Sequence, residues 1–330
     1  MKRKNILTIN IITYNHAPYI AKCIDSILEQ KTSFGYIIRI FDDCSTDGTT
    51  KICQQYADKF PDKIEFYPTE KNLGPIYNPI RAYSGIKTPY YILVEGDDYL
   101  CGKGRFQEQY EILERHPECS FCAGCSYTNF VNGEVQGGYF PILKSGIYSL
   151  DWLRCNIGVN IMPHSGTRMV RTKCISLDMK QPNPWLNDIT QMFELLRQGA
   201  MYYVDKEWCV YNYTGTGIWS GQKTFGKIKF ILNNLYEYNV YTNGFFEEIL
   251  LEVFRRDLEY NINFYNKMKV CEEIDNENIQ FIPFRQNATV YFNLLYYFKR
   301  FRRFIFPPAI MMCLHIPRNL YRYCKRRWKK

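Results

Sequence analysis

The chain has 330 residues, of which 46% are hydrophobic, so it is long enough to bury a sizeable core as one large domain or two smaller ones. Its net charge of +9 is uneven, because residues 286–330 contain eleven Lys or Arg and no Asp or Glu, while the residues before them are nearly neutral. The 13 Cys are scattered and odd in number, and residues 5–14 are too short and polar for a signal sequence, which predicts a reducing cytosol. No run reaches the ~20 apolar residues that span a bilayer, so a transmembrane protein is not expected.

Strand and helix patterns alternate along the first 100 residues. Short apolar, β-branched runs predict strands, and apolar residues at helical spacing predict helices between them. The expected strands are 6–12, 36–41, 64–67 and 90–94, and the expected helices are 20–28, 50–59 and 76–84. This alternation predicts an α/β fold with a mainly parallel central sheet and helices on both faces.

The rest of the chain changes from mixed patterns to helical ones. A hairpin turn is expected at Asn132-Gly133. The expected elements are helices at 106–115 and 187–199 and strands at 119–130, 134–135, 163–170, 201–204 and 208–211. Beyond residue 223, the patterns at 228–238, 245–264 and 288–303 predict a helical C-terminal extension.

Two consecutive acidic residues, Asp42 and Asp43, end the second expected strand. A helix cap explains Ser45 and Asp47 in the following loop, but it does not explain a pair of Asp at a strand end. Open α/β sheets bind ligands beyond the carboxyl ends of their strands. A carboxylate there can accept the imide N–H of uracil or the hydroxyls of ribose, so Asp42 and Asp43 are candidate nucleotide-binding residues.

Three carboxylates, Glu95, Asp97 and Asp98, follow the fourth expected strand directly. A solvated acidic turn is the alternative interpretation. Like charges this close destabilise the fold unless a positive group lies between them, and Mg²⁺ or Mn²⁺ prefers such hard oxygen ligands. A divalent metal bound here would hold the phosphates of a nucleotide donor and stabilise the leaving phosphate.

Four motifs in this order resemble those of glycosyltransferase family 2, and they are Ile11–Asn15, Asp42–Thr49, Asn72–Gly74 and Glu95–Tyr99. The resemblance covers roughly residues 5–110. It implies an inverting nucleotide-sugar enzyme with a GT-A fold. The domains implied are a GT-A catalytic domain at 1–222, with a nucleotide-binding half at 1–110 and an acceptor-binding half at 111–222, and the helical extension at 223–330.

The same resemblance implies roles for individual residues. The residues implied to contact the nucleotide are Thr13, Tyr14, Asn15, Asp42, Asp43, Asn72 and Asp97. Asp97 would be the metal-ligating end of the family's Asp-x-Asp motif, with Asp98 beside it. Glu95 is the third candidate metal ligand, at the position where the commonest motif has Asp.

Asp188 begins the helix expected at 187–199. Its spacing alone fits an acidic residue that the helix macrodipole favours, whereas the resemblance implies that Asp188 is the catalytic base for the acceptor hydroxyl. The residues expected beside the acceptor or donor sugar are His164, Trp185, Asn187 and Trp219. Near Trp219, Asn212 and Thr214 stand where related sequences often have Arg and His.

Cys119, Cys122 and Cys125 lie in one expected strand. Three side chains at this spacing along a strand do not converge on a metal, so buried free cysteines are predicted. The basic tail has three interpretations: nucleic acid, for which no recognition motif is present, a solvated helix, and an anionic membrane surface. Its Phe, Ile, Met, Tyr and Trp residues between basic clusters favour the membrane, and no nucleic-acid partner is expected.

The sequence therefore predicts a metal-dependent inverting glycosyltransferase at the cytoplasmic face of the plasma membrane. Its expected partners are a nucleotide sugar, expected to be UDP-linked, and a saccharide acceptor, expected to be lipid-linked and part of a surface polysaccharide. Two alternatives remain, a nucleotidyltransferase acting on a sugar phosphate and a catalytically inactive membrane-associated binding protein. The first lacks a basic Gly-rich loop after the first strand, and the intact carboxylates argue against the second.

Overall fold

A computed structural model describes part of the chain, all of it within the first of the two units into which the chain divides, Met1–Glu277. The described residues are 3–131, 138–141, 143–156, 162–176, 178–183, 185–215, 234–235, 237–247 and 249–250. The predicted domain boundary at 222/223, Trp219, most of the helical extension and the basic tail lie outside them.

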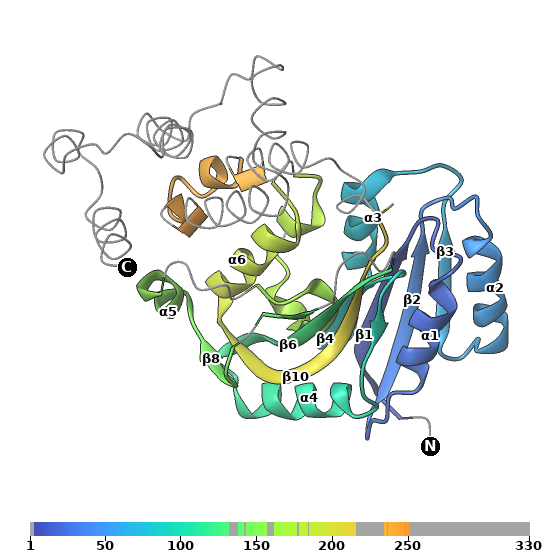
Figure 1. Cartoon of the computed structure of the whole chain (residues 1–330), viewed down its shortest axis with the longest axis horizontal. Coiled ribbons are helices and arrows are strands. Elements are labelled where there is room, and N and C mark those ends of the chain that lie inside the picture. Colours follow the sequence, from blue (N-terminus) through green and yellow to red (C-terminus); the bar gives the residue numbers. More distant parts are fainter. Residues whose placement is uncertain are drawn as a thin grey trace, which may run out of the picture. The chain divides into compact units, whose positions relative to one another are not determined.

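The first 115 residues of the chain form alternating strands and helices, as predicted (Figure 1). The elements are β1 (Asn5–Thr13), α1 (Ile20–Leu28), β2 (Gly35–Asp42), α2 (Thr49–Lys59), β3 (Ile64–Pro68), α3 (Gly74–Tyr83), β4 (Tyr90–Glu95), β5 (Tyr99–Leu100) and α4 (Arg105–Arg115). Strand β1 pairs in parallel with both β2 and β4, and β2 pairs in parallel with β3. Asp42 is level with Thr13, and Glu95 is level with Ile12, so the strand ends meet at one edge of the sheet.

The second half of the described chain adds short elements and one long strand. They are β6 (Cys119–Phe130), β7 (Gly138–Phe140), β8 (Gly146–Tyr148), α5 (Leu150–Cys155), η1 (Ser165–Thr167), β9 (Met169–Arg171), η2 (Thr172–Cys174), η3 (Asp178–Lys180), α6 (Asp188–Gln198) and β10 (Ala200–Tyr213). The sheet runs β3-β2-β1-β4-β9-β6-β10-β5. The short strand β9 joins the two halves, because it pairs antiparallel with both β4 and β6.

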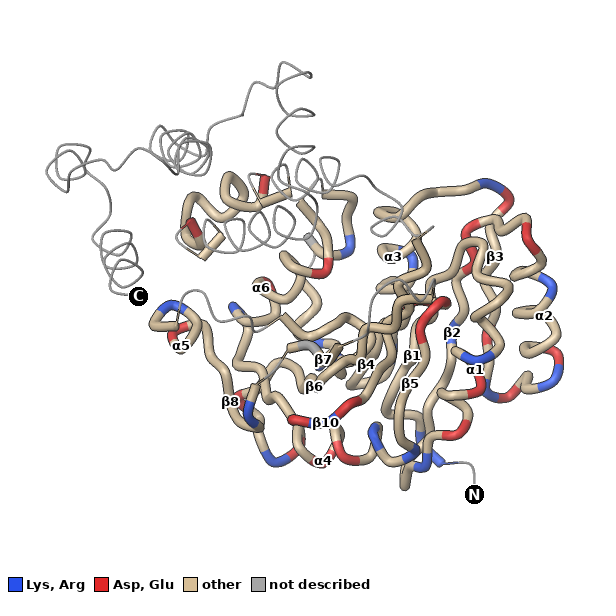
Figure 2. The backbone as a smooth tube through the Cα atoms, in the orientation of Figure 1, with Lys and Arg blue, Asp and Glu red and all other residues tan. Residues whose placement is uncertain are grey.

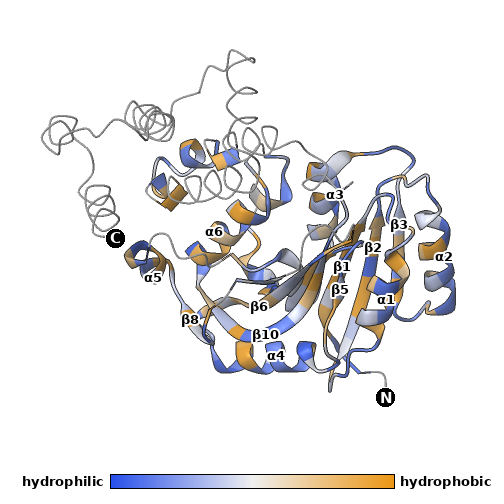
Figure 3. Ribbon diagram, in the orientation of Figure 1, coloured by the Kyte–Doolittle hydropathy of each residue, from blue (hydrophilic) through white to orange (hydrophobic). Residues whose placement is uncertain are grey.

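Alternate side chains of β1 face opposite sides of the sheet, as the strand period requires. Ile9 and Ile11 belong to the main hydrophobic core, to which α1, α2 and α4 contribute. Asn10 points the other way, and its Nδ2 donates to the carbonyl of Ala82 in α3 at 2.7 Å. Figure 1 shows α4 and α6 on opposite sides of the sheet, and Figure 3 shows the hydrophobic residues concentrated on its strands. Helices therefore cover both faces, as predicted.

Two predictions about strands are wrong, for local reasons. The strands expected at 201–204 and 208–211 form one strand, β10, because an irregularity between Val204 and Glu207 accommodates the exposed Asp205 and Lys206. The strand expected at 163–170 is only β9, preceded by a 3₁₀ turn that His164 caps, with its Nδ1 accepting the N–H of Gly166 at 3.2 Å. The expected hairpin turn lies outside the described residues, but β7 does pair antiparallel with β6.

Charged residues are concentrated on the helices and loops around the sheet, whereas the central strands are almost free of them (Figure 2). Cys119, Cys122 and Cys125 are buried and form no disulfide, as predicted. Within the described part of the chain, no helix is both long and apolar enough to cross a membrane.

Candidate active site

The loops after β1 and β2 are hydrogen-bonded to each other at the carboxyl edge of the sheet. Asn15 has a left-handed backbone, with φ of 56°, which Asn tolerates better than most residues. Its N–H donates to Ser45 Oγ at 2.8 Å, and its Oδ1 accepts the N–H of Thr46 at 2.8 Å. Asn15, a predicted nucleotide contact, therefore also fixes the shape of the loops on which the other candidates lie.

The two carboxylates of the Asp42-Asp43 pair lie in different environments. Asp42 is fully buried, and its side chain accepts hydrogen bonds from the hydroxyls of Ser45 and Thr50. Asp43 accepts the backbone N–H groups of Leu73 at 2.7 Å and Gly74 at 2.8 Å, one on each oxygen. Because a carboxylate has about four acceptor positions, Asp43 retains the capacity to bind a ligand while it orders the turn before α3.

The carboxyl groups of Glu95, Asp97 and Asp98 converge, with one oxygen from each within 4.8 Å of the others. Burial, followed by the charges of Asp97 and Asp188, raises the pKa of Glu95 to about 8. Burial also raises the pKa of Asp97, and burial together with its acidic neighbours raises the pKa of Asp98 well above its usual range. A bound cation would relieve this repulsion.

Gly96 lets β1 and its following loop approach these carboxylates closely. Its N–H donates to the carbonyl of Ile12 at 2.9 Å. A Cβ at this position would lie 2.7 Å from Thr13 Oγ1 and 3.0 Å from His16 Nδ1. Thr13, a predicted nucleotide contact, is thus buried against the turn that carries Asp97.

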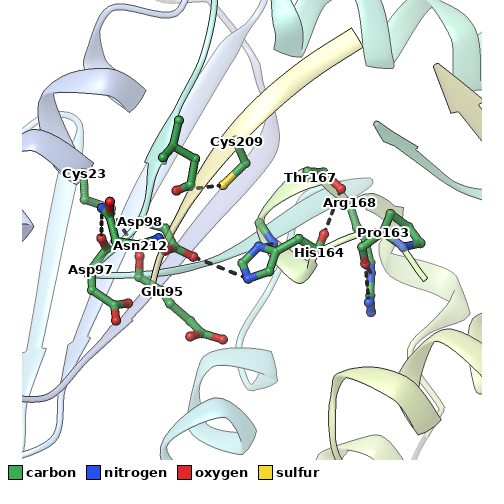
Figure 4. A network of polar contacts seen from close by, with 12 residues as sticks. Cys23, Glu95, Asp97, Asp98, Pro163, His164, Thr167, Arg168, Cys209 and Asn212 are labelled. Carbon is green, nitrogen blue, oxygen red and sulfur yellow. Dashed lines mark hydrogen bonds and ion pairs between the residues drawn. The ribbon is translucent and has the colours of Figure 1, made fainter. Parts of the chain in front are cut away.

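Asp98 is held by groups from the second half of the chain (Figure 4). The N–H of Asn212 donates to Asp98 Oδ1 at 3.0 Å, and Asn212 Nδ2 donates to the carbonyl of Asp97 at 2.6 Å. His164 Nε2 lies 3.5 Å from Asp98 Oδ2. Burial lowers the pKa of His164 to about 3, so this imidazole is neutral.

A second group of potential metal ligands comprises Asp98, His164 and Cys209, which each offer one atom within 4.8 Å of the others. The hydrogen bond of His164 argues against its use as a ligand. Because Nδ1 accepts the N–H of Gly166, the neutral ring carries its proton on Nε2, the atom that faces Asp98. His164 therefore presents an N–H to Asp98 rather than a lone pair to a metal.

Asp188 is exposed at the first position of α6. The preceding Asn187 caps the helix, since its Oδ1 accepts the N–H of Thr190 at 2.9 Å. Arg168 also fixes this end of the helix, because it donates to the carbonyls of Asp188 at 2.8 Å and Pro163 at 2.6 Å. The charge of Asp188 contributes to the raised pKa of Glu95, after burial and the charge of Asp97.

The remaining predicted contacts differ in exposure. Tyr14 and Asn72 are exposed, and Tyr14 is accessible over 44% of its surface. Trp185 is only 3% exposed, and its ring stacks on Tyr241 with 4.6 Å between centroids. The structure thus brings the donor-side candidates to one edge, whereas Trp185 packs among aromatic side chains.

Sequence reasoning did not assign three residues that the structure places at the site, namely His16, Arg168 and Asn212. His16 has a local signal, because it directly follows Tyr14 and Asn15 in a loop at the carboxyl edge of the sheet. Arg168 has no such signal. Asn212 stands where related sequences often have Arg, but its partner Asp97 lies 115 residues away in the sequence. The candidate carboxylates fit a divalent cation, because Asp97 Oδ1 and Asp98 Oδ2 are buried without a hydrogen-bond partner.

Comparison with known proteins identifies the family. A family model described as glycosyl transferase family 2 matches residues 8–174, which contain the Asp42-Asp43 pair and the Glu95–Asp98 carboxylates. The chain belongs to glycosyltransferase family 2. This match covers half of the chain and confirms the resemblance in the four motifs.

Relatives of this family 2 chain include an uncharacterized protein of Mycobacterium tuberculosis, 34% identical over 147 residues, which are 44% of this chain and 42% of that protein. The putative teichuronic acid biosynthesis glycosyltransferase TuaG of Bacillus subtilis is 30% identical over 152 residues, covering 44% of this chain and 59% of that protein. The matches thus span less than two thirds of the length of these curated relatives.

Solved structures share the fold of this family 2 chain. Staphylococcus aureus TarS 1–349, in complex with UDP-GlcNAc, aligns with a TM-score of 0.57 and 19% identity over 81% of this chain and 74% of that chain. The mannosyltransferase PcManGT from Pyrobaculum calidifontis, in complex with GDP-Man and Mn²⁺, aligns with a TM-score of 0.53 and 14% identity over 76% and 69%. The predicted GT-A class of α/β fold is confirmed.

Proposed function

We propose that this chain is a metal-dependent, inverting glycosyltransferase that moves a sugar from a UDP-linked donor to a lipid-linked saccharide during synthesis of a surface polysaccharide. The convergence of Glu95, Asp97 and Asp98 beside the nucleotide-side loops is the observation that carries the proposal. The teichuronic acid name of one relative and the nucleotide sugars bound to the structural neighbours support it.

The donor-side roles follow from the positions of the loops. Asp43 is proposed to bind uracil or ribose with the acceptor capacity that its bonds to Leu73 and Gly74 leave. The other proposed contacts on this side are Thr13, Tyr14, Asn15 and Asn72. Asp42, whose side chain accepts hydrogen bonds within the loop, is proposed to order that loop and so to position Asp43 for the nucleotide.

Asp97 is proposed as the principal carboxylate ligand of the metal, with Asp98 and Glu95 beside it. When bound, Mn²⁺ or Mg²⁺ would neutralise the charge that develops on the leaving diphosphate. Asn212 positions this turn, since its side chain binds the carbonyl of Asp97 while its N–H binds the carboxylate of Asp98. His164, whose Nε2 lies 3.5 Å from Asp98 Oδ2, is proposed to lie beside the acceptor.

Asp188 is proposed as the general base that accepts the proton of the acceptor hydroxyl. It is exposed, and the cap of Asn187 and the hydrogen bond from Arg168 to its carbonyl fix its backbone. One base without a covalent intermediate produces inversion, because the acceptor attacks opposite the leaving group. Trp185 and Trp219 are proposed to shape the sugar-binding region, Trp185 by packing behind Asn187.

The decisive experiment measures UDP release from a panel of nucleotide sugars, with Mn²⁺, Mg²⁺ or chelator. Asp188→Asn should reduce transfer by about 10²–10⁴-fold, the range for a general base, while UDP affinity stays within a factor of about two. Asp151→Asn is the matched control, since Asp151 lies in the first turn of another helix, α5, and should keep full activity. Full activity of Asp188→Asn would overturn the base assignment, and the absence of turnover with every donor would overturn the enzyme assignment.

The proposed domain division assigns transfer to residues 1–222 and attachment at the inner face of the plasma membrane to residues 223–330. The eleven basic residues within 286–330 support it, because each basic side chain near anionic lipid contributes about 1 kcal/mol. The full chain should sediment with phosphatidylglycerol vesicles and not with phosphatidylcholine vesicles. Equal sedimentation with both, or with neither, would contradict the attachment.

A further inference from the structure

The side chain of His16 faces the carboxylate of Asp97. His16 Nε2 lies 3.7 Å from Asp97 Oδ2, and the two side chains are 20% and 9% exposed. This distance exceeds that of a hydrogen bond. It is shorter than about 4.2 Å, the largest separation of two ligands that each lie about 2.1 Å from one cation. The two atoms are therefore close enough to bind one cation together.

The backbone on both sides of His16 is fixed, so the direction of its side chain is built into the fold. Its N–H donates to Thr49 Oγ1 at 2.8 Å, and its carbonyl accepts the N–H groups of Tyr19 and Ile20 at 2.9 Å as α1 begins. The next residue, Ala17, donates its N–H to Asp47 Oδ2 at 2.9 Å. A ligand held this way loses little conformational entropy on binding.

Buried polar atoms without partners surround this position. Asp97 Oδ1, His16 Nδ1 and Thr13 Oγ1 are buried and have no hydrogen-bond partner. A bound cation would satisfy Asp97 Oδ1, because buried polar atoms in folded proteins almost always have a partner. Thr13 Oγ1 and His16 Nδ1 lie beside Gly96, which is in the same turn as Asp97.

His164 and His16 differ in whether the nitrogen that faces a carboxylate carries a proton or can present a lone pair. His164 Nδ1 accepts an N–H, so its Nε2 carries the proton. No hydrogen bond fixes the tautomer of His16, whose Nε2 is therefore free to present its lone pair toward Asp97. His16 is the imidazole suited to bind a metal.

We propose that His16 is a nitrogen ligand, beside Asp97, of the divalent metal in the proposed function, and that this ligand makes the site prefer Mn²⁺ to Mg²⁺. Imidazole nitrogen suits first-row transition metals, whereas Mg²⁺ takes oxygen ligands and keeps much of its water. The inference rests on the proposed function only in that a divalent metal binds at these carboxylates.

The test uses the full chain with Mn²⁺, alone and with UDP or GDP. Pulsed electron paramagnetic resonance should show imidazole ¹⁴N coupling to bound Mn²⁺ in the wild type and in His116→Gln, whose imidazole pairs with Glu118 away from the site. His16→Gln should lose the coupling. In titration calorimetry its Mn²⁺ affinity should fall on the order of tenfold or more, with less than a threefold change for Mg²⁺.

Bound Mn²⁺ without nitrogen coupling in the wild-type chain would overturn this inference and leave the proposed transfer reaction in place. Coupling that survives in His16→Gln but disappears in His164→Gln would assign the nitrogen to the other imidazole and also overturn it. The wild-type spectrum needs no substitution, so the inference stays testable even if His16→Gln fails to fold. Absence of Mn²⁺ binding under all three conditions would overturn both this inference and the metal dependence of the proposed function.

Discussion

Replacing Gly96 by Ala tests the close packing beneath the carboxylate turn. The added Cβ would lie 2.7 Å from Thr13 Oγ1, 2.9 Å from Thr13 Cβ and 3.0 Å from His16 Nδ1, whereas ordinary contact begins at 3.4 Å. To reach ordinary contact, these neighbours must move away by about 0.4–0.7 Å. Thr13 lies in a strand paired on both sides, and its carbonyl accepts the N–H of Asp43 at 2.9 Å, so it has little freedom to do so.

Overpacking of this kind destabilises folded proteins by about 1–3 kcal/mol, and this is the expected loss of unfolding free energy for Gly96→Ala in urea denaturation. A shift of the turn that carries Asp97 should also reduce transfer by roughly 10–100-fold, since misplacement by about 1 Å costs on the order of 10²-fold. Gly146→Ala is the matched control, because nothing lies within 4 Å of its Cβ position, and its stability should change by less than about 0.5 kcal/mol. Equal stability of the two variants would refute the packing argument.

Three further predictions concern the helix cap at Asn187, the proposed nucleoside contact of Asp43 and the proposed divalent metal. Asn187→Ala should lower the unfolding free energy by about 0.5–2 kcal/mol and slow transfer, because the helix loses its cap. Asn187→Asp keeps a cap and should change neither the stability nor the transfer rate. Urea denaturation measures the stability, and UDP release measures the transfer rate. Asp43→Asn should weaken UDP binding about tenfold in calorimetry, because one of the N–H groups of Leu73 and Gly74 loses its acceptor; unchanged affinity would exclude Asp43 from the nucleoside site. Chelation of divalent metal should weaken UDP binding because Asp97 and its acidic neighbours repel diphosphate, and affinity that is independent of metal would argue against the metal site.

The positions of the candidate donor-side residues could be predicted from the sequence, because they depend on local rules. Parallel neighbours bring their carboxyl ends to one edge, so a residue at the end of a strand, such as Asp42 or Glu95, is placed as soon as the strands are recognised. The sequence did not predict which polar groups already have partners inside the protein. Asp42 bonds within its own loop, and Asn187 caps α6.

Local sequence patterns do not predict hydrogen bonds between residues that are far apart in the sequence. Asn212 reaches Asp97 across 115 positions in the sequence because β10 runs unbroken through an irregularity that the polar residues Asp205 and Lys206 concealed. The 3₁₀ turn at His164 depends on a side chain capping its own backbone, which a strand pattern cannot reveal. Hydrophobic periodicity shows which face of a helix or strand is buried, but it does not show which strands become neighbours in the sheet.

The three-residue strand β9 has a consequence for how the fold opens. Among the residues that the structure describes, it pairs with Tyr90 and Tyr91 on one side and with Phe121 and Cys122 on the other. Neighbouring strands such as β1 and β2, or β6 and β10, share much longer ladders. The two parts of the sheet are thus joined by short ladders, at β9 and where β5 pairs with β10. Short ladders of this kind favour local opening, which native-state hydrogen exchange detects. The hydrogen bond from Asn212 to Asp98 crosses between these two parts of the sheet, so local opening there would disturb the carboxylate turn.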